Sequence, residues 1–307
     1  MEPIDILGLG GVAVDDLVFV DAFPPPDAKT VVARRERACG GLTATALVAA
    51  ARLGAACSYA GVLGTDGLSD YAIEVMAREG IGLAHLRREA TAKPLYSTII
   101  IDPGRHTRNV FVDLSDVVGA ALDWPPPEVI QASRVLFVDS IGPAGMLRAA
   151  RLARAAGVPV VGDIEDTGPQ PTQLIAEVDH LILSWEFARL FTGAETPELA
   201  ARALWSEGRQ VVVITDGERG CWTLAAEAPG RLRVAHQPAF KVAVVDTTGC
   251  GDVFHGAYAA GLVRGLGVGE RVRLAAAAAA LKATRPGGQA GAPTLADVEQ
   301  FLRRADA

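Results

Sequence analysis

A glycine-rich segment that ends in a carboxylate, Asp246–Asp252 (DTTGCGD), carries the clearest chemistry in this chain. Apolar Val242–Val245 lead into it as a predicted strand, and residues 253–262 follow it as a predicted helix. The first N–H groups of a helix lack intrahelical partners and lie at the positive end of the helix dipole, so they attract anions such as a phosphoryl group. A carboxylate among them repels that anion unless it has another task, such as accepting a proton from an attacking hydroxyl. The segment therefore suggests phosphoryl transfer to an alcohol.

Three other glycine segments each have a structural and a functional interpretation. Gly40-Gly41 precedes a predicted helix, where glycines either pack in a tight turn or let a small polyol approach the backbone. Residues 215–220 (TDGERG) close a predicted strand and form either a hairpin turn or a binding place for a nucleotide phosphate. Gly8–Ala13 matches the G-x-G-x-x-A dinucleotide pattern, which needs a helix directly after the glycines. Residues Val12–Val20 favour a strand, so a nicotinamide-dependent oxidoreductase is the weaker hypothesis.

Carboxylates occur in two predicted extended segments. Asp15 and Asp16 face opposite ways on a strand, so one of them can point to a ligand. Asp163 and Glu165 are alternate residues after a predicted strand, where they either hold hydrated Mg²⁺ or face solvent. The five histidines and four cysteines show no metal-ligand spacing. We expect free buried thiols and a cytoplasmic location.

The composition excludes several classes of protein. The chain has 307 residues, 50% of them hydrophobic, and a formal net charge of −7. It has no basic tract, so we expect no nucleic acid and no membrane among its partners. The N-terminus lacks the basic start of a signal peptide, and no apolar run is long enough to cross a bilayer.

Strands and helices alternate along most of the chain. Strands are predicted at Ile4–Leu9, Cys57–Val62, Val135–Val138, Val158–Val161, Leu181–Leu183 and Val211–Thr215. Helices are predicted at 43–53, 69–79, 144–156 and 197–207. The alternation indicates an α/β fold, with a doubly wound, mostly parallel sheet and helices on both faces.

Two extended regions, about 12–38 and 94–113, do not fit this alternation. The second contains a predicted hairpin with an Asp102-Pro103-Gly104 turn. We expect the two regions to pair into a small β-sheet lid over the C-terminal edge of the main sheet, where ligands bind in such folds. The whole chain, 1–307, is thus predicted to be one domain with a β lid.

Four ordered motifs resemble those of the ribokinase (PfkB) family of carbohydrate kinases, over essentially the whole chain. Asp246–Asp252 is similar to the family signature D-T-x-G-A-G-D, with Cys250 in place of alanine. Gly40-Gly41 matches the start of the N-terminal signature. The G-x4-D spacing of the family is matched by Gly10 and Asp15, and its T-x-G-x-x-G nucleotide turn by Thr215, Gly217 and Gly220.

The resemblance implies an ATP-dependent sugar kinase with a ribokinase-like fold. Asp252 would deprotonate a sugar hydroxyl, and the amides of Gly249, Cys250 and Gly251 would form the anion hole for the transferring phosphoryl group. The other expected contacts are Asp15, Gly40, Gly41, Thr45 and Asn109 for the sugar, and Ser184, Thr215, Gly217 and Gly220 for ATP.

Cations and a partner chain also follow from the resemblance. Asp246, with the Thr248 carbonyl, corresponds to a monovalent-cation site of the family and implies K⁺. Mg²⁺ would accompany ATP, with its waters held by Asp163 or Glu165. The lid is often a dimer interface in this family, so we expect a homodimer through the lid, with a small-molecule sugar as substrate.

The chain departs from the family pattern in places that leave the substrate open. Thr45 stands where an asparagine often binds sugar hydroxyls, and Ser184–Phe187 replaces an N-x-x-E motif.

Several segments resemble sulfofructose kinase, and others resemble ketohexokinase-like members. The sulfonate-binding residues of sulfofructose kinase fall near apolar Ile141 and Val110, which cannot supply charge-assisted bonds. Nearby polar residues that could replace them are Arg105, Arg108 and Asn109. A nucleoside kinase on the same fold and a catalytically silent sugar-binding regulator remain alternatives.

Overall fold

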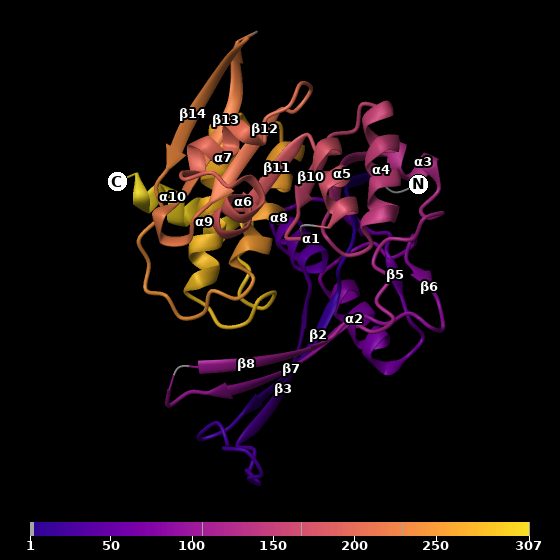
Figure 1. Cartoon of the computed structure of the whole chain (residues 1–307), viewed down its shortest axis with the longest axis vertical. Helices are drawn as coiled ribbons and strands as arrows, with labels where there is room; N and C mark the ends of the chain where they lie inside the picture. Colours follow the sequence, from indigo (N-terminus) through magenta and orange to yellow (C-terminus); the bar gives the residue numbers. More distant parts are fainter. Residues whose placement is uncertain (1–2, 106, 167, 229, 307) are drawn as a thin grey trace.

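The computed structural model describes residues 3–105, 107–166, 168–228 and 230–306. Its centre is an eight-stranded sheet in the order β14-β13-β12-β11-β10-β9-β1-β4 (Figure 1). The strands are β1 (Ile4–Leu9), β4 (Cys57–Tyr59), β9 (Ser133–Val138), β10 (Val160–Asp163), β11 (His180–Ser184), β12 (Val211–Thr215), β13 (Cys221–Ala228) and β14 (Arg231–Gln237). The strands from β12 to β4 run parallel, and β13 and β14 are antiparallel additions at one edge.

The strands are apolar because both faces of the sheet are buried. Alternate residues of one strand point to opposite faces. Ile6 and Val213 accordingly belong to one hydrophobic core, and their neighbours Leu7 and Val212 belong to the other. Two cores on one sheet confirm the predicted doubly wound α/β architecture.

In the described part of the chain, five helices cover each face of the sheet. The first core includes residues of α1 (Leu42–Arg52), α2 (Gly67–Arg78), α8 (Cys250–Val263), α9 (Val268–Ala283) and α10 (Leu295–Ala305). The second includes residues of α3 (Pro127–Gln131), α4 (Pro143–Ala155), α5 (Pro169–Glu177), α6 (Trp185–Thr192) and α7 (Pro197–Ala203). Within the described ranges, no helix is long and apolar enough to cross a membrane.

A separate four-stranded sheet, in the order β3-β2-β7-β8, projects from the main body (Figure 1). Its strands are β2 (Ala13–Phe19), β3 (Arg34–Gly40), β7 (Leu95–Asp102) and β8 (Thr107–Asp113), and β7 and β8 form the expected hairpin. The chain enters β2 directly after the glycines at 10 and 11. The helix that a nicotinamide-binding fold requires there is therefore absent, since these residues form a strand.

Two predictions of extended structure were wrong in part or in full. In the extended region of about 12–38, the second strand begins only at Arg34. Val242–Val245 lies in no strand, and Val244 and Val245 are each 63% exposed. The N–H groups of Val245 and Asp246 instead donate to the Ala283 carbonyl at the end of α9. β-branched residues favour a strand only where a partner strand is available, and this segment is held by a helix end.

Candidate active site

Polar residues gather at one edge of the main sheet. Asp139 directly follows β9, Asp163 ends β10, and Ser184 and Thr215 are paired at the ends of β11 and β12. Parallel strands bring their carboxyl ends to the same edge, which is where such folds bind ligands. Helix α8 begins at this edge, because its residue His255 contacts Asp163.

The glycine turn begins α8 as the sequence predicted. Gly249 caps the helix with a φ of 75°, and a Cβ there would lie 3.0 Å from the Cα of Gly288, so only glycine fits. A Cβ on Gly251 would meet no atom within 4 Å, so this position opens toward free space. The Cys250 N–H is an exception to the predicted anion hole, because it donates to the Thr247 carbonyl at 3.2 Å. The structure thus leaves the neighbouring N–H groups of the first turn as the better anion donors.

Asp252 lies on the first turn of α8, as expected for a base beside an anion site. Burial and the nearby Asp163 carboxylate raise the pKa of Asp252 well above its ordinary value, although His255 lowers it. Glu165 and Asp139 add to the rise. A carboxylate with a raised pKa is a stronger proton acceptor, which suits a general base.

Asp163 and Glu165 differ in their surroundings. Asp163 is 3% exposed, and its Oδ2 lies 3.3 Å from His255 Nδ1. The same ring nitrogen lies 2.8 Å from the carbonyl oxygen of Gly251. Asp163 therefore has a protein partner already, whereas the exposed Glu165 is free to hold a water of hydrated Mg²⁺. Among the described residues, no group of three His, Cys, Asp or Glu side chains forms a complete metal site.

Three of the predicted sugar-binding residues, Asp15, Gly40 and Gly41, lie where the smaller sheet joins the main body. A Cβ on Gly40 would lie 3.0 Å from Asp15 Oδ2, so the glycine keeps the space beside this carboxylate clear. Burial raises the pKa of Asp15, a hydrogen bond from Ser97 opposes this, and Asp16 adds to the rise. Gly41 has a φ of 94° and packs against the backbone of Gly11, which gives it a structural role.

Two of the predicted sugar contacts do not face this space. Thr45 is only 1% exposed, so it can contact a sugar only if neighbouring atoms move. Asn109 pairs with Ile100, whose side chain lies on the face of the smaller sheet opposite to Asp15. The prediction for Asn109 is corrected by this register.

Arg108, next in sequence to Asn109, lies on the same face as Asp15. Its Nη1 donates to Thr248 Oγ1 at 2.6 Å, across 140 residues of sequence. At the base of the same sheet, Gln289 Nε2 lies 3.7 Å from Cys39 Sγ, and Cys39 pairs with Val14 on the face opposite to Asp15. The Arg108 contact brings the Asp15 face of the smaller sheet toward the 246–252 turn.

The predicted ATP-side residues lie together at the ends of β11 and β12. Ser184 Oγ accepts a hydrogen bond from the Phe187 N–H at 3.2 Å and so caps α6. Gly217 and Gly220 have φ values of 53° and 88° and form the turn between β12 and β13. These structural roles explain the glycines and Ser184 without a ligand. The N–H groups of Asp216, Arg219 and Gly220 donate to carbonyl oxygens within the turn, which leaves those of Gly217 and Glu218 as candidates for a nucleotide.

Asp139 is a buried residue of the site that sequence reasoning missed. Its Oδ2 accepts hydrogen bonds from the Gly11 N–H at 2.7 Å and from Thr43 Oγ1 at 2.7 Å, and its Oδ1 accepts one from the Ile141 N–H at 2.7 Å. Burial raises the pKa of Asp139 to about 6. An aspartate directly after the predicted strand Val135–Val138 was the available signal.

Asp246 has a structural role in the turn. Its Oδ1 accepts from the Thr248 N–H at 2.9 Å, and its Oδ2 accepts from the Gly287 N–H at 2.8 Å. Burial raises the pKa of Asp246, but hydrogen bonds from Thr248 and Gly287, with Lys282 nearby, hold it below its ordinary value.

The implied monovalent-cation site does not fit these residues. The main-chain oxygen of Asp246 accepts a hydrogen bond from Lys282 Nζ at 2.7 Å. A K⁺ ion on this oxygen would have to share it with an ammonium group, and the two like charges repel each other.

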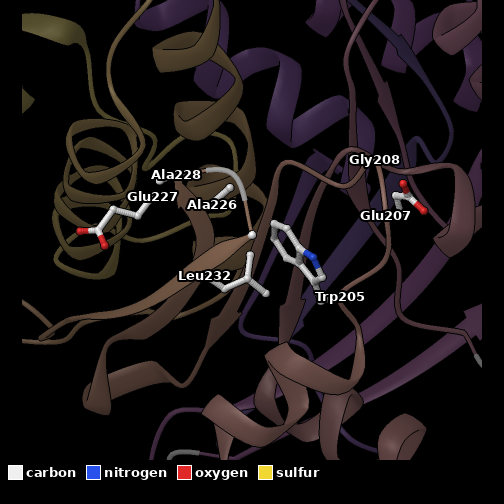
Figure 2. Close-up of a pocket in the computed structure, with 8 residues that line it drawn as sticks. Trp205, Glu207, Gly208, Ala226, Glu227, Ala228 and Leu232 are labelled. Atoms are coloured by element: carbon white, nitrogen blue, oxygen red, sulfur yellow. The ribbon is translucent and has the colours of Figure 1, made fainter.

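One cavity, of about 640 Å³, lies away from this edge (Figure 2). It is lined by Trp205, Glu207, Gly208, Ala226, Glu227, Ala228, Gly230 and Leu232. In Figure 2 the Trp205 ring faces Leu232, while the Glu207 and Glu227 carboxylates point away from the ring. The cavity lies between the loop before β12 and the β13–β14 hairpin, so it is not part of the candidate site.

Several known proteins are similar to this chain in sequence and in fold. The model of the pfkB family carbohydrate kinases matches residues 9–295. A ribokinase from Haemophilus influenzae is 27% identical over 317 residues, covering 97% of this chain and 98% of the relative. The structure of a putative ribokinase from Agrobacterium tumefaciens has a TM-score of 0.89 and 29% identity, over 99% of this chain and 98% of the other.

A more distant structure extends the match in fold. An Arabidopsis thaliana ribokinase, solved with ribose and ATP, has a TM-score of 0.83 at 23% identity, over 99% of both chains. The family match spans the main sheet, the smaller sheet and the 246–252 turn. This chain therefore belongs to the PfkB family of carbohydrate kinases.

Proposed function

We propose that this protein transfers the γ-phosphoryl group of ATP to a hydroxyl of a free sugar, with Asp252 as the base. The observation that carries the proposal is the position of Asp252 on the first turn of α8, beside Gly251, with a raised pKa. A sugar hydroxyl at Asp252 would lose its proton as the phosphoryl group arrives at the helix N-terminus. The N–H groups of Gly249 and Gly251 would stabilise the charge on the transferring group.

The acceptor in this proposal is a small polyol held between the two sheets. Asp15 supplies a carboxylate that accepts hydrogen bonds from hydroxyl groups, and Gly40 leaves room beside it. The relatives named ribokinase support a free pentose as the first candidate. Arg108 would close the site from the lid side, through Thr248.

Nucleotide and Mg²⁺ would lie at the ends of β11 and β12. The turn 215–220 directly follows β12, its Gly217 and Glu218 N–H groups would bind the phosphates, and Glu165 is exposed after β10. Mg²⁺ bound with the phosphates would neutralise part of their charge. Glu165 would hold its waters, while Asp163 would keep His255 in place.

The smaller sheet would act as a lid and as a homodimer interface in the cytoplasm. Its Asp15 face would cover the site and exclude water once sugar is bound. Its opposite face has an open apolar cavity of about 600 Å³, whose lining includes Val18, Ile100 and Phe111. An exposed apolar surface of this kind is typical of a protein contact.

A screen for ADP release tests the proposal and its alternatives. Pentoses, hexoses, sulfosugars, sugar phosphates and nucleosides are each offered with Mg-ATP, with thermal shift as a parallel binding measurement. We expect turnover with a free sugar. Turnover with nucleosides alone would assign a nucleoside kinase, and sugar binding without ADP release by any ligand would assign a silent regulator.

A further inference from the structure

Lys282, near the end of α9, has a fully buried side chain at the turn that begins α8. It is 0% exposed, and its Nζ donates to the carbonyl oxygens of Asp246 at 2.7 Å and Arg285 at 3.2 Å. The same nitrogen lies 3.9 Å from Asp246 Oδ2. A lysine is rarely buried to this extent without paired charge and acceptors, and here it has both.

The acceptors around Lys282 are those expected of a site for a monovalent cation. Two carbonyl oxygens and one carboxylate lie around a single positive charge, and oxygen ligands are those that hard cations prefer. The carboxylate belongs to Asp246, which also orients the Thr248 and Gly287 N–H groups. The ammonium group is therefore placed to hold the turn from which Asp252 and the anion-binding amides project.

The carbonyl oxygens of the neighbouring loop also accept hydrogen bonds from a positively charged side chain, Arg52. Arg52 of α1 donates through Nη1 to the carbonyl oxygens of Gln289 at 3.0 Å and Ala292 at 2.7 Å. Its other guanidinium nitrogens bind Glu79. Lys282 and Arg52 thus already donate hydrogen bonds to carbonyl oxygens of this region, which are therefore less available to a free metal ion.

Gly291 makes the space that Lys282 occupies. A Cβ at position 291 would lie 2.7 Å from Lys282 Cδ, 3.1 Å from Lys282 Cε and 2.8 Å from the carbonyl oxygen of Gly287, so the stem of Lys282 is one of two reasons for glycine there. The backbone of Gly291 does not have a positive φ, so alanine is compatible with its conformation. The absence of a side chain at 291 is therefore explained by the stem of Lys282 together with the Gly287 carbonyl group.

We propose that the Lys282 ammonium takes the place of a monovalent metal ion at this turn, so that the enzyme works without K⁺. The proposal deepens the proposed kinase function and rests on it for its catalytic consequence. The tethered cation needs no binding from solution, so its occupancy does not depend on the salt present.

The first test compares the wild-type protein in KCl and in tetramethylammonium chloride at equal ionic strength, after removal of K⁺ and NH₄⁺. We expect kcat and the melting temperature to agree in the two salts, with kcat within about twofold. A saturable rise of kcat by fivefold or more with K⁺, or a saturable rise of the melting temperature, would overturn the proposal.

The second test removes the ammonium group of Lys282. In Lys282→Ala we expect kcat to fall by about tenfold or more without K⁺, and to recover saturably with KCl or NH₄Cl. Lys282→Met keeps most of the stem and should not recover, and Lys241→Met, at an exposed lysine, should leave activity and salt response unchanged. A loss in Lys282→Ala that neither ion restores would mean that Lys282 acts through packing, which contradicts the proposal.

A readout without turnover separates this proposal from the kinase assignment. The melting temperature of Lys282→Ala should rise with K⁺, while that of the wild type should not, even if no sugar is ever phosphorylated. Gly291→Ala should lower the melting temperature of the wild type more than that of Lys282→Ala, because only the clash with the Gly287 carbonyl remains once the lysine stem is removed. If Lys282→Ala does not fold, the wild-type salt comparison still decides.

Discussion

At the scale of single residues, the proposed chemistry depends on Asp252. Asp252→Asn removes the proton acceptor and keeps the shape, so we expect kcat to fall by about 10²–10⁴-fold. ATP affinity should change little, because the amides of the turn remain. Turnover and ATP binding by calorimetry measure the two effects. A variant with near-normal kcat would exclude Asp252 as the base.

Gly251 offers a test of the anion hole at a neighbouring residue. Gly251→Ala adds a methyl group on the open side of the turn, where no protein atom lies within 4 Å. Alanine is favoured over glycine in a helix by up to about 1 kcal/mol, so stability should not fall. The methyl group should obstruct the phosphoryl group, and we expect kcat to fall by about tenfold or more.

The matched control for this variant is Gly269→Ala. Gly269 is also the second residue of a helix, α9, and a Cβ there likewise meets no atom within 4 Å. It should give the same gain in melting temperature and unchanged kcat. Equal kinetics for the two variants would argue against a ligand at Gly251.

At the scale of elements, the contact between β8 and the glycine turn couples the lid to the site. Arg108→Met removes the bond to Thr248 and should raise the KM for sugar by about tenfold, because lid closure loses a polar contact. The melting temperature should hardly change, since exposed polar contacts contribute about 1 kcal/mol or less. Arg105→Met, in the same hairpin, is the comparison. If only Arg105→Met raises the KM, the role assigned to Arg108 is wrong.

The two faces of the lid lead to a separate prediction about assembly. Phe111 is 58% exposed and lines the apolar cavity on the face opposite to Asp15. Phe111→Glu should shift the proposed dimer to monomer, because it places a charge in an apolar interface. Sedimentation velocity measures this, with Val31→Glu as a control in the same region, where the side chain is 87% exposed. A wild-type monomer at all concentrations would refute the dimer.

At the scale of the whole molecule, Asp139 joins its own loop to two segments that are distant in sequence. It binds the start of α1 at Thr43, the β1–β2 connection at Gly11 and the loop at Ile141. An asparagine offers one oxygen and would turn an NH₂ group toward donors. We expect Asp139→Asn to lower the free energy of unfolding by about 2–4 kcal/mol at pH 7.5.

The raised pKa of Asp139 makes the free energy of unfolding depend on pH. The pKa of Asp139 is about 6 in the folded protein, above the ordinary 3.8, so between these pH values the native state binds more protons than the unfolded state. The stabilising effect of this proton is present below about pH 4 and is lost as pH rises through 6, by roughly 3 kcal/mol. Urea unfolding at several pH values should show this loss in the wild type relative to Asp139→Asn. A constant difference between the two would contradict the raised pKa.

Local pattern predicted much of the fold. Strand and helix periodicity located β1, β9, β12, α1 and α4 to within a few residues, because each buries its own apolar face. It failed at Val242–Val245, where β-branched residues had no strand to pair with. The family resemblance placed Asn109 in the site, because sequence does not state which face of a hairpin points inward.

The sequence by itself determined the family, the α/β architecture and the glycine turn with Asp252. Each motif and each helix or strand is encoded by the spacing of residues within its own short stretch of chain. Only the tertiary structure decided which side chains complete the site. Arg108 meets Thr248 across 140 residues, Asp139 meets Thr43 across 96, and Lys282 meets Asp246 across 36. Such contacts depend on the packing of whole elements, and no local propensity encodes them. For that reason the cation implied by Asp246 proved, on our proposal, to be a lysine of the chain itself.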